Sequence, residues 1–213
     1  MLRNQVHRII VGELETNCYL LWDRKNTALI IDPGAEGEKI EDEIISLALE
    51  PAAVILTHGH YDHIGAANFI AEAFSIPIFA DEDEMEMLKN PEKNFSAFVG
   101  EPVVVNANLL NRDVLKRLNI HLRLMKLPGH TRGSIGLLDE KFLICGDVVF
   151  AGGGIGRTDL PDANPYDLAD SIEKILQLPD DIVIMPGHGG RSYIKKEREI
   201  WQQGVKMLRE DLF

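Results

Sequence analysis

The segment Thr57-His58-Gly59-His60-Tyr61-Asp62-His63 places three histidines and an aspartate within six residues. It follows the apolar run 53–56, which predicts a buried strand, and leads into a predicted helix over residues 63–74. Imidazole and carboxylate groups are the donors that zinc, iron and manganese use in open catalytic sites. The segment therefore predicts a catalytic metal site where a strand ends and a helix begins.

Two further histidines share a setting, in Leu127-Pro128-Gly129-His130 and in Met185-Pro186-Gly187-His188. Each tetrapeptide ends a predicted strand, and its proline and glycine turn the backbone sharply so that the histidine projects from the end of the strand. Asp147 follows the predicted buried strand 142–145 in the same way. Because ligand sites in α/β proteins gather at such strand ends, we expect these groups to join the first cluster.

Together these motifs supply more donors than one metal ion with an open coordination position requires. The candidate metal ligands are His58, His60, Asp62, His63, His130, Asp147 and His188. Their number favours two ions that share a bridging carboxylate and hold a water between them. Such a water has a pKa near neutrality, so hydroxide is available at pH 7. His7 and His121 lie within strand runs, and we interpret them as surface or structural residues.

Outward from these motifs, the hydrophobic pattern alternates between strand and helix periods. The predicted strands are 5–11, 18–22, 28–31, 53–56, 76–80, 121–127, 134–138, 142–145 and 182–185. The predicted helices are 38–49, 63–74, 165–176 with Asn164 as its N-cap, and a C-terminal helix with Ile194, Trp201, Val205, Leu208 and Leu212 on its buried face. Residues 90–111, with Phe95 and Phe98, are less regular, and they either cover the site or fold into the core. No linker rich in glycine, proline or serine interrupts the pattern, which predicts one α/β domain over residues 1–213.

The composition excludes several classes of protein. With 45% hydrophobic and 26% charged residues the chain is ordinary for a globular protein, which argues against disorder and coiled coil. A formal net charge of −12 argues against a nucleic-acid partner. No apolar run approaches the roughly 18 residues of a membrane span, and the N-terminus lacks an apolar signal core, so we expect a cytoplasmic protein without a membrane partner. Cys18 and Cys145 lie in apolar runs and are predicted to be buried and unpaired. The oligomeric state stays open.

The motifs THGHYDHIG, PGHTRGS, GDVVF and PGHG follow one another in this order over nearly the whole chain. Together they resemble the metallo-β-lactamase superfamily, whose fold is a four-layer αββα sandwich with the metal site at one edge of the two sheets. Within that superfamily, ETNCYLL at 15–21, IDPG at 31–34 and GIGRTDLP at 154–161 are similar to short glyoxalase II-like (hydroxyacylglutathione hydrolase-like) hydrolases. The resemblance implies one ion held by His58, His60 and His130, a second held by Asp62, His63 and His188, and Asp147 as the bridge.

The resemblance also implies an enzyme, a dinuclear metal hydrolase that cleaves a small acyl thioester such as S-lactoylglutathione. A metal-bridging hydroxide would attack the carbonyl carbon, and a metal ion would stabilise the oxyanion as a Lewis acid. The candidate catalytic carboxylates are Asp147 as the bridge and Asp62, which is either a plain ligand or also orients the attacking water. We expect two divalent ions, zinc in the first place, with iron and manganese as alternatives that the same donors accept.

Two residues outside the donor set are predicted to support it. Asp32 ends a strand and begins the turn Asp32-Pro33-Gly34, and the resemblance implies that it also steadies a metal-bound histidine from behind. Arg157 lies in the glycine-rich loop after Asp147. It is the candidate substrate-binding residue for an anionic substrate, and the alternative is a salt bridge with Asp159.

Two alternatives to the hydrolase stay open. The GRTD segment also resembles persulfide dioxygenases of the same superfamily, which use one iron held by residues that match His58, His130 and Asp147. A non-catalytic metal-binding protein would use the same donors without turnover. Full-length glyoxalase II enzymes carry a helical C-terminal extension that contacts glutathione, whereas only residues 189–213 follow His188 here, so recognition of glutathione is open as well.

Overall fold

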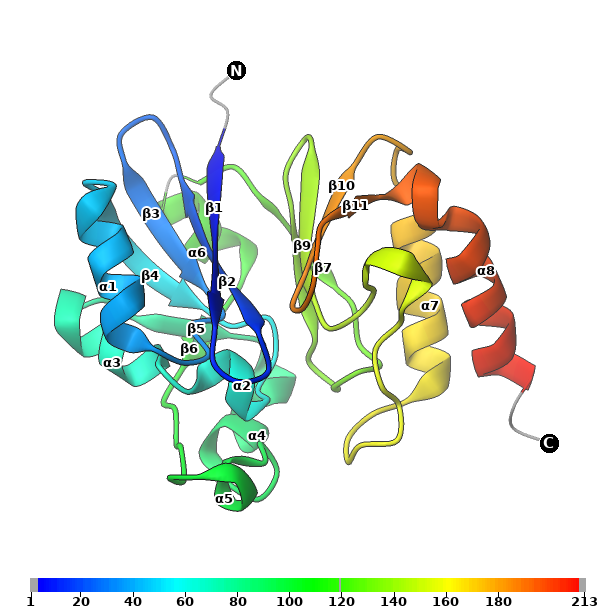
Figure 1. Ribbon diagram of the computed structural model, residues 1–213, viewed down its shortest axis with the longest axis horizontal. Helices are drawn as coiled ribbons and strands as arrows, with labels where there is room; N and C mark the ends of the chain where they lie inside the picture. Colours follow the sequence, from blue (N-terminus) through cyan, green and yellow to red (C-terminus); the bar gives the residue numbers. More distant parts are fainter. Residues whose placement is uncertain (1–3, 119, 211–213) are drawn as a thin grey trace. The chain divides into compact units, whose positions relative to one another are not determined.

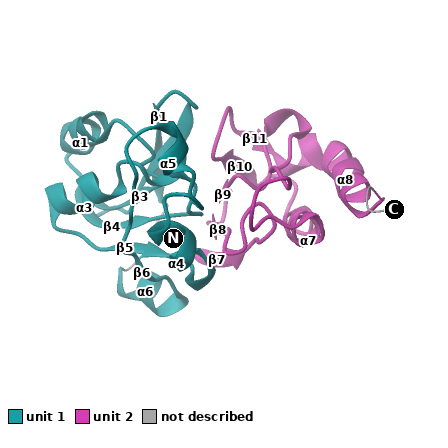
Figure 2. Cartoon of the chain, turned by 90° about the horizontal axis from the view of Figure 1, so that it is seen from below, with its two compact units in different colours: residues 1–121 teal, residues 122–213 magenta. Residues whose placement is uncertain are grey.

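The structure is a computed structural model that describes residues 4–118 and 120–210. The chain divides into two compact units, unit 1 with residues 1–121 and unit 2 with residues 122–213 (Figure 2). Each unit contains one β-sheet and its own helices. The predicted α/β class is therefore confirmed, while one domain over residues 1–213 stays a prediction.

Unit 1 is built on a six-stranded sheet whose strands follow the order of the chain. They are β1 (Gln5–Val11), β2 (Thr16–Trp22), β3 (Thr27–Ile31), β4 (Glu50–Ile55), β5 (Ile78–Ala80) and β6 (Asn108–Leu109). The first three pair antiparallel through short connections, whereas β3 to β6 pair parallel because helical segments connect them. The carboxyl ends of β3 and β4 therefore meet at one edge of the sheet, where Asp32 and Thr57 begin the loops that carry the motifs.

The helices of unit 1 lie within the crossover connections between its parallel strands and after β6. They are α1 (Gly37–Ser46), α2 (Tyr61–Ile64), α3 (Ala67–Phe74), the 3-10 helix η1 (Glu82–Glu84), α4 (Met85–Lys89), α5 (Ser96–Val99) and α6 (Arg112–Arg117). α1 and α3 lie side by side (Figure 1), and they bury Ile40, Ile44 and Ile70 in the core of this unit. Burial of these side chains supplies the hydrophobic free energy that holds the helices on the sheet.

The helix predicted over 63–74 is in fact two helices, α2 and α3, with a break at Gly65 and Ala66. At the break, Gly65 lies against the backbone of Gly34, and an added Cβ would clash with the Gly34 carbonyl oxygen. The Ala66 N–H donates to the Pro33 carbonyl at 2.9 Å. The turn after β3 is thus packed directly against the segment that carries the histidines.

Unit 2 is built on a five-stranded sheet in the order β11-β10-β9-β8-β7. The strands are β7 (Arg123–Lys126), β8 (Ile135–Leu138), β9 (Phe142–Gly146), β10 (Val183–Pro186) and β11 (Ser192–Tyr193). Its helices are the 3-10 helix η2 (Ala151–Gly153), α7 (Pro165–Leu176) and α8 (Ile194–Glu210). β9 and β10 pair parallel, and the other neighbours pair antiparallel. As predicted, Asn164 caps α7, accepting from the backbone N–H groups of Tyr166 and Asp167.

Helices α7 and α8 run side by side (Figure 1), each with an apolar stripe toward the core of unit 2. The fully buried Trp201 of α8 lies in this core together with Ile194 and Val205. Leu208 packs against it from the edge, and Leu212 lies outside the described residues. The stripe predicted for the C-terminal helix is therefore core packing.

The segment 90–111 is more ordered than its sequence predicts. It contains α5 and β6, and the buried Asn94 side chain donates to the carbonyls of Met87 and Val103 at 3.3 and 2.9 Å. Phe98 is nevertheless 71% exposed. The short elements here and α6 escaped prediction because a period of 3.6 cannot be recognised in six residues or fewer. Cys18 and Cys145 are buried, and neither forms a disulfide within the described part of the chain, as expected.

Candidate metal centre

The histidine segment of unit 1 runs from the end of β4 into α2. His58 and His60 precede the helix, while Asp62 and His63 lie within it. The ring centroid of His58 lies 4.8 Å from that of His60 and 4.1 Å from that of His63. All three imidazoles are buried. Unit 1 thus brings four of the candidate ligands together in one loop and one turn of helix.

Asp32 lies behind these rings at the end of β3, with φ 52°, in the left-handed region that aspartate tolerates. Its Oδ1 accepts the backbone N–H of Thr57 at 2.7 Å, and its Oδ2 accepts the Thr57 hydroxyl at 2.6 Å. The same Oδ2 lies 3.0 Å from Nδ1 of His63. Asp32 therefore contacts a candidate ligand without being one, the position implied for it by the resemblance.

This network assigns the protons of two histidines. A carboxylate only accepts hydrogen bonds, so Nδ1 of His63 carries a proton, and in the neutral ring Nε2 is the nitrogen that offers a lone pair. The Thr57 hydroxyl gives its one proton to Asp32, so it accepts from Nδ1 of His58 at 3.1 Å. Both rings are thus fixed in the neutral tautomer whose Nε2 can bind a metal ion.

Asp62 is held from the opposite side by Thr16 of β2, whose hydroxyl donates to Oδ2 at 3.1 Å. The same oxygen lies 3.4 Å from Nε2 of His63. When His63 is neutral its proton is on Nδ1, and this contact then joins two acceptors, the imidazole lone pair and a carboxylate oxygen. A divalent cation bound to both would turn the repulsion between them into attraction.

Two residues that sequence reasoning missed, Glu84 and Asn94, hold the segment in place, and Phe95, named as a residue of a segment that covers the site or joins the core, lies against it. The buried carboxylate of Glu84 accepts the Gly59 N–H at 2.7 Å, between His58 and His60. The carbonyl of Asn94 accepts the Tyr61 N–H at 2.9 Å. The Phe95 ring centroid lies 5.5 Å from that of His60. Nothing in the local pattern points to Glu84 or Asn94, since the acidic run at 81–86 is typical of a solvated surface and Asn94 acts through its backbone.

The remaining candidate ligands belong to unit 2. β9 and β10 are parallel neighbours, so Asp147 and His188 follow them at the same edge of the sheet, where the Gly187 N–H donates to the Gly146 carbonyl at 2.8 Å. Oδ2 of Asp147 lies 3.4 Å from Nε2 of His188 and 3.8 Å from Nε2 of His130. Unit 2 therefore places one carboxylate between two imidazoles.

His130 is oriented by the backbone. The preceding Gly129 has φ 135°, and an added Cβ there would clash with the backbone of Leu168 in α7. Nδ1 of His130 lies 3.1 Å from the carbonyl oxygen of Arg157. A carbonyl only accepts, so Nδ1 holds the proton and Nε2 offers its lone pair on the side of Asp147.

The loop that contains Arg157 is tied to α8 by Glu197. This carboxylate is buried and accepts the Ser192 hydroxyl at 2.6 Å and the backbone N–H groups of Gly152 and Gly153. Burial alone would raise the pKa of Glu197, but these hydrogen bonds outweigh burial and lower the pKa. The bonds therefore stabilise the ionised carboxylate beneath the loop.

The Arg157 side chain is exposed and forms a fork with Asp159, with Nε to Oδ1 at 2.9 Å and Nη2 to Oδ2 at 2.7 Å. Its hydrogen bonds hold the pKa of Asp159 below the ordinary value. This is the salt bridge that the sequence offered as the alternative role, and contact with a substrate stays a prediction. The contribution of Arg157 to His130 comes from its carbonyl, which no side-chain pattern reveals.

The two histidines interpreted as surface or structural residues, His7 and His121, are half-buried and exposed, respectively. His7 lies on β1, and its Nε2 lies 3.3 Å from an oxygen of Glu43, with both side chains about two-fifths exposed. His121 is exposed at the end of unit 1. Neither residue belongs to the groups of donors described above.

Residues 11–188 match the model of the metallo-beta-lactamase superfamily. The chain belongs to the metallo-β-lactamase superfamily. It is 37% identical over 199 residues to the hydroxyacylglutathione hydrolase GloC of Haemophilus influenzae. The aligned residues cover 89% of this chain and 93% of the relative. Membership supports a metal-dependent hydrolase, because the histidines and aspartates of the family motif are all present.

Solved structures agree with this membership of the metallo-β-lactamase superfamily. The crystal structure of the BLEG-1 B3 metallo-β-lactamase matches with a TM-score of 0.82 and 32% identity, over 92% of this chain and 97% of that one. That of TTHA1623 in a di-iron-bound form matches with a TM-score of 0.80 and 27% identity, over 92% and 98%. The fold and its His-rich donor set imply binding of divalent metal. Among the helices of the described residues, none has the length and apolar composition needed to cross a membrane.

Proposed function

We propose that this chain is a dinuclear metal hydrolase that cleaves a small acyl thioester, with S-lactoylglutathione as the reference substrate. By the family pattern, one ion is assigned to His58, His60 and His130, the second to Asp62, His63 and His188, and Asp147 to both. The proposal depends above all on the proton assignment. Hydrogen bonds at Nδ1 leave Nε2 as a lone-pair donor in three histidines, from both units.

The donor set fits divalent metal ions. Neutral imidazole and carboxylate are ligands that zinc, iron and manganese accept in open sites. The contacts of Asp62 with His63 and of Asp147 with His130 each bring a carboxylate oxygen within 3.4 and 3.8 Å of Nε2, the ring nitrogen that binds a metal ion when the imidazole is neutral. We propose zinc as the resident metal, with iron and manganese as alternatives.

When bound, two such ions supply a Lewis acid for the thioester carbonyl and hydroxide at neutral pH. The residues of the chain position the reactants. Thr16 donates to one oxygen of Asp62 and fixes the carboxylate, which can then accept a proton from water. Cys18 is no alternative nucleophile, because burial raises the pKa of its thiol and keeps it protonated, and Cys145 is buried as well.

The thioester substrate is supported by the relative named hydroxyacylglutathione hydrolase. A thiolate is also a good leaving group, so hydrolysis of a thioester needs no residue to protonate it. The dioxygenase alternative predicts a different stoichiometry, one iron per chain and consumption of oxygen.

Elemental analysis of protein purified without added metal, together with thiol release from S-lactoylglutathione, tests the proposal. We expect about two metal ions per chain and free glutathione without uptake of oxygen. One iron per chain, with oxygen uptake on glutathione persulfide and no thioester cleavage, would replace the hydrolase with the dioxygenase. Bound metal with neither reaction would leave a metal-binding protein.

A further inference from the structure

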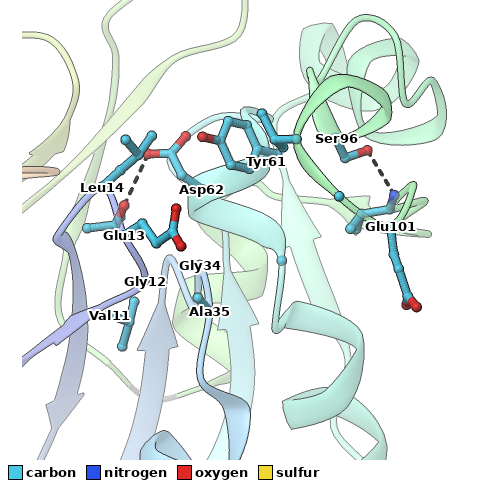
Figure 3. A pocket seen from close by; sticks show the side chains of 15 residues that line it. Val11, Gly12, Glu13, Leu14, Gly34, Ala35, Tyr61, Asp62, Ser96 and Glu101 are labelled. Carbon is cyan, nitrogen blue, oxygen red and sulfur yellow. Dashed lines mark hydrogen bonds between the residues drawn. The ribbon is translucent and has the colours of Figure 1, made fainter.

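A pocket of about 520 Å³ opens beside Asp62, entirely within unit 1 (Figure 3). Its walls come from the β1–β2 connection, the turn after β3, helix α2 and residues 96–103. The lining residues are Val11, Gly12, Glu13, Leu14, Thr16, Gly34, Ala35, Tyr61, Asp62, Gly65, Ser96, Val99, Gly100, Glu101 and Val103. The volume lies within the roughly 300–1,000 Å³ of small-molecule sites.

The walls of this pocket are mostly apolar. In the pocket wall, Val11 is buried and Val103 is half-buried, while Leu14 and Val99 are 51% and 55% exposed. Large apolar side chains exposed at a concave surface gain free energy when a ligand covers them. The pocket therefore favours a ligand with aliphatic groups.

The charged residues of the pocket are all acidic. Figure 3 shows the Asp62 carboxylate and the Tyr61 ring side by side, with the Glu13 side chain extending below them toward Gly34. Glu101 also lines the pocket, although its carboxylate points away from Asp62 (Figure 3). Among the described residues that line the pocket there is no lysine, arginine or histidine.

Asp62 is assigned to a metal ion under the proposed function, so Glu13 is the carboxylate that this pocket offers to a ligand. Lys39, near the β1–β2 connection, donates to the Ile10 carbonyl at 2.8 Å and pairs with Glu36. Tyr61 also offers an aromatic face to a cation.

We propose that this pocket binds the thiol portion of the substrate and selects a thiol that carries an ammonium group over one with carboxylates. The inference rests on the proposed thioesterase activity. It assigns the thiol portion because a small acyl group such as lactoyl would occupy little of the volume. Glu13 is the specificity-determining residue. A glutathione thioester, whose thiol portion has a negative net charge, is then cleaved, but less efficiently than a thioester of a cationic thiol.

Three thioesters with the same acyl group test the charge preference: butyrylthiocholine, S-butyryl-N-acetylcysteamine and S-butyrylglutathione. Thiol release gives kcat/KM for each. We expect the cationic ester to be cleaved best and the glutathione ester worst. Glu13→Gln should reduce the ratio between these two by about tenfold, the effect of roughly 1.4 kcal/mol. Equal rates, or a ratio that Glu13→Gln leaves unchanged, would overturn the proposal.

Glu15→Gln is the matched control, because Glu15 is exposed in the same connection and does not line the pocket. It removes the same charge and should leave the ratio as in the wild type. An equal drop in both variants would show a general effect of net charge instead of a site, and would refute the role of Glu13.

A binding experiment separates the failure of this inference from the failure of the proposed function. Calorimetry with butyltrimethylammonium and the full-length protein with its metal bound needs no turnover. We expect binding that weakens about tenfold in Glu13→Gln and not in Glu15→Gln. Binding without cleavage of any thioester would support the pocket and reject the thioesterase. Thioester cleavage without a charge preference, together with no binding of butyltrimethylammonium, would support the thioesterase and reject the role of the pocket.

Discussion

The two units hold their histidines by different means. In unit 1, side chains orient the histidines. The Asp32 carboxylate contacts His63 directly and His58 through the Thr57 hydroxyl, and all of these groups are buried. In unit 2, the backbone does it, since the Arg157 carbonyl orients His130. The His188 side chain is 26% exposed, whereas that of His63 is not exposed at all.

This difference determines where each half is vulnerable. A carboxylate that accepts from a ligating histidine raises the basicity of that histidine and fixes its tautomer. A single substitution removes this carboxylate. A backbone carbonyl survives every substitution at its own residue, so its position depends on whatever holds the loop. In unit 2 that is Glu197, which binds Gly152 and Gly153. We therefore expect unit 1 to be sensitive at Asp32 and unit 2 at Glu197.

Removing a ligand from either unit should have the largest effect, and the effect should be equally severe in the two units, because a dinuclear hydrolase needs the ligands of both. His63→Ala and His188→Ala are each expected to lose metal and to lower thioester hydrolysis by about a hundredfold or more. Metal content and thiol release measure both effects. A single-iron dioxygenase would tolerate either change.

His121→Ala is the control for these two variants, since His121 is an exposed histidine outside the groups of donors. It should keep wild-type metal content and rate. Oxygen uptake with glutathione persulfide that survives in His188→Ala, together with absent thioester cleavage, would favour the dioxygenase.

The second prediction compares support of a histidine by a side chain, in unit 1, with support by the backbone, in unit 2. Asp32→Asn keeps the shape of the residue but removes the charge that faces His63, so metal affinity should fall by about 10–100-fold. Arg157→Ala removes the fork with Asp159 but keeps the carbonyl that faces His130, so metal affinity should stay unchanged. Competition with a chromophoric chelator measures both. Comparable losses in the two variants would mean that the Arg157 side chain, and not its carbonyl, supports the site.

Sequence reasoning predicted those parts of the fold and candidate site whose physical cause is local. The geometry of the motif H-x-H-x-D-H after a buried strand is determined locally, because the end of the strand and the start of the helix leave few ways to place the imidazole rings. The turn Asp32-Pro33-Gly34 is likewise visible, since proline and glycine mark the end of β3. The break at Gly65 was missed, because it results from contact with Gly34, 31 residues earlier in the chain.

The supports that were missed act over long separations or through the backbone. Glu84 reaches the Gly59 N–H from an acidic run that is typical of a solvated surface. Glu197 lies in the run KKERE, which has the same character, and yet it is buried. Their partners are mainly N–H groups, which every residue except proline has, so no residue type marks the contact in the sequence.

Glu197→Gln tests the support in unit 2 and should give the smallest effect, a loss of about 1–3 kcal/mol in the free energy of unfolding at pH 7. Hydrogen bonds outweigh burial and lower the pKa of Glu197 in the folded state. Its stabilisation is therefore complete above the unfolded pKa of about 4.3 and is lost as the pH falls through the folded value. Urea unfolding should show the gap between wild type and variant closing in that acidic range. Glu199→Gln, an exposed neighbour on α8, should change little at any pH. A gap that stays constant down to pH values below the folded pKa would mean that packing, and not the ionised carboxylate, holds the loop.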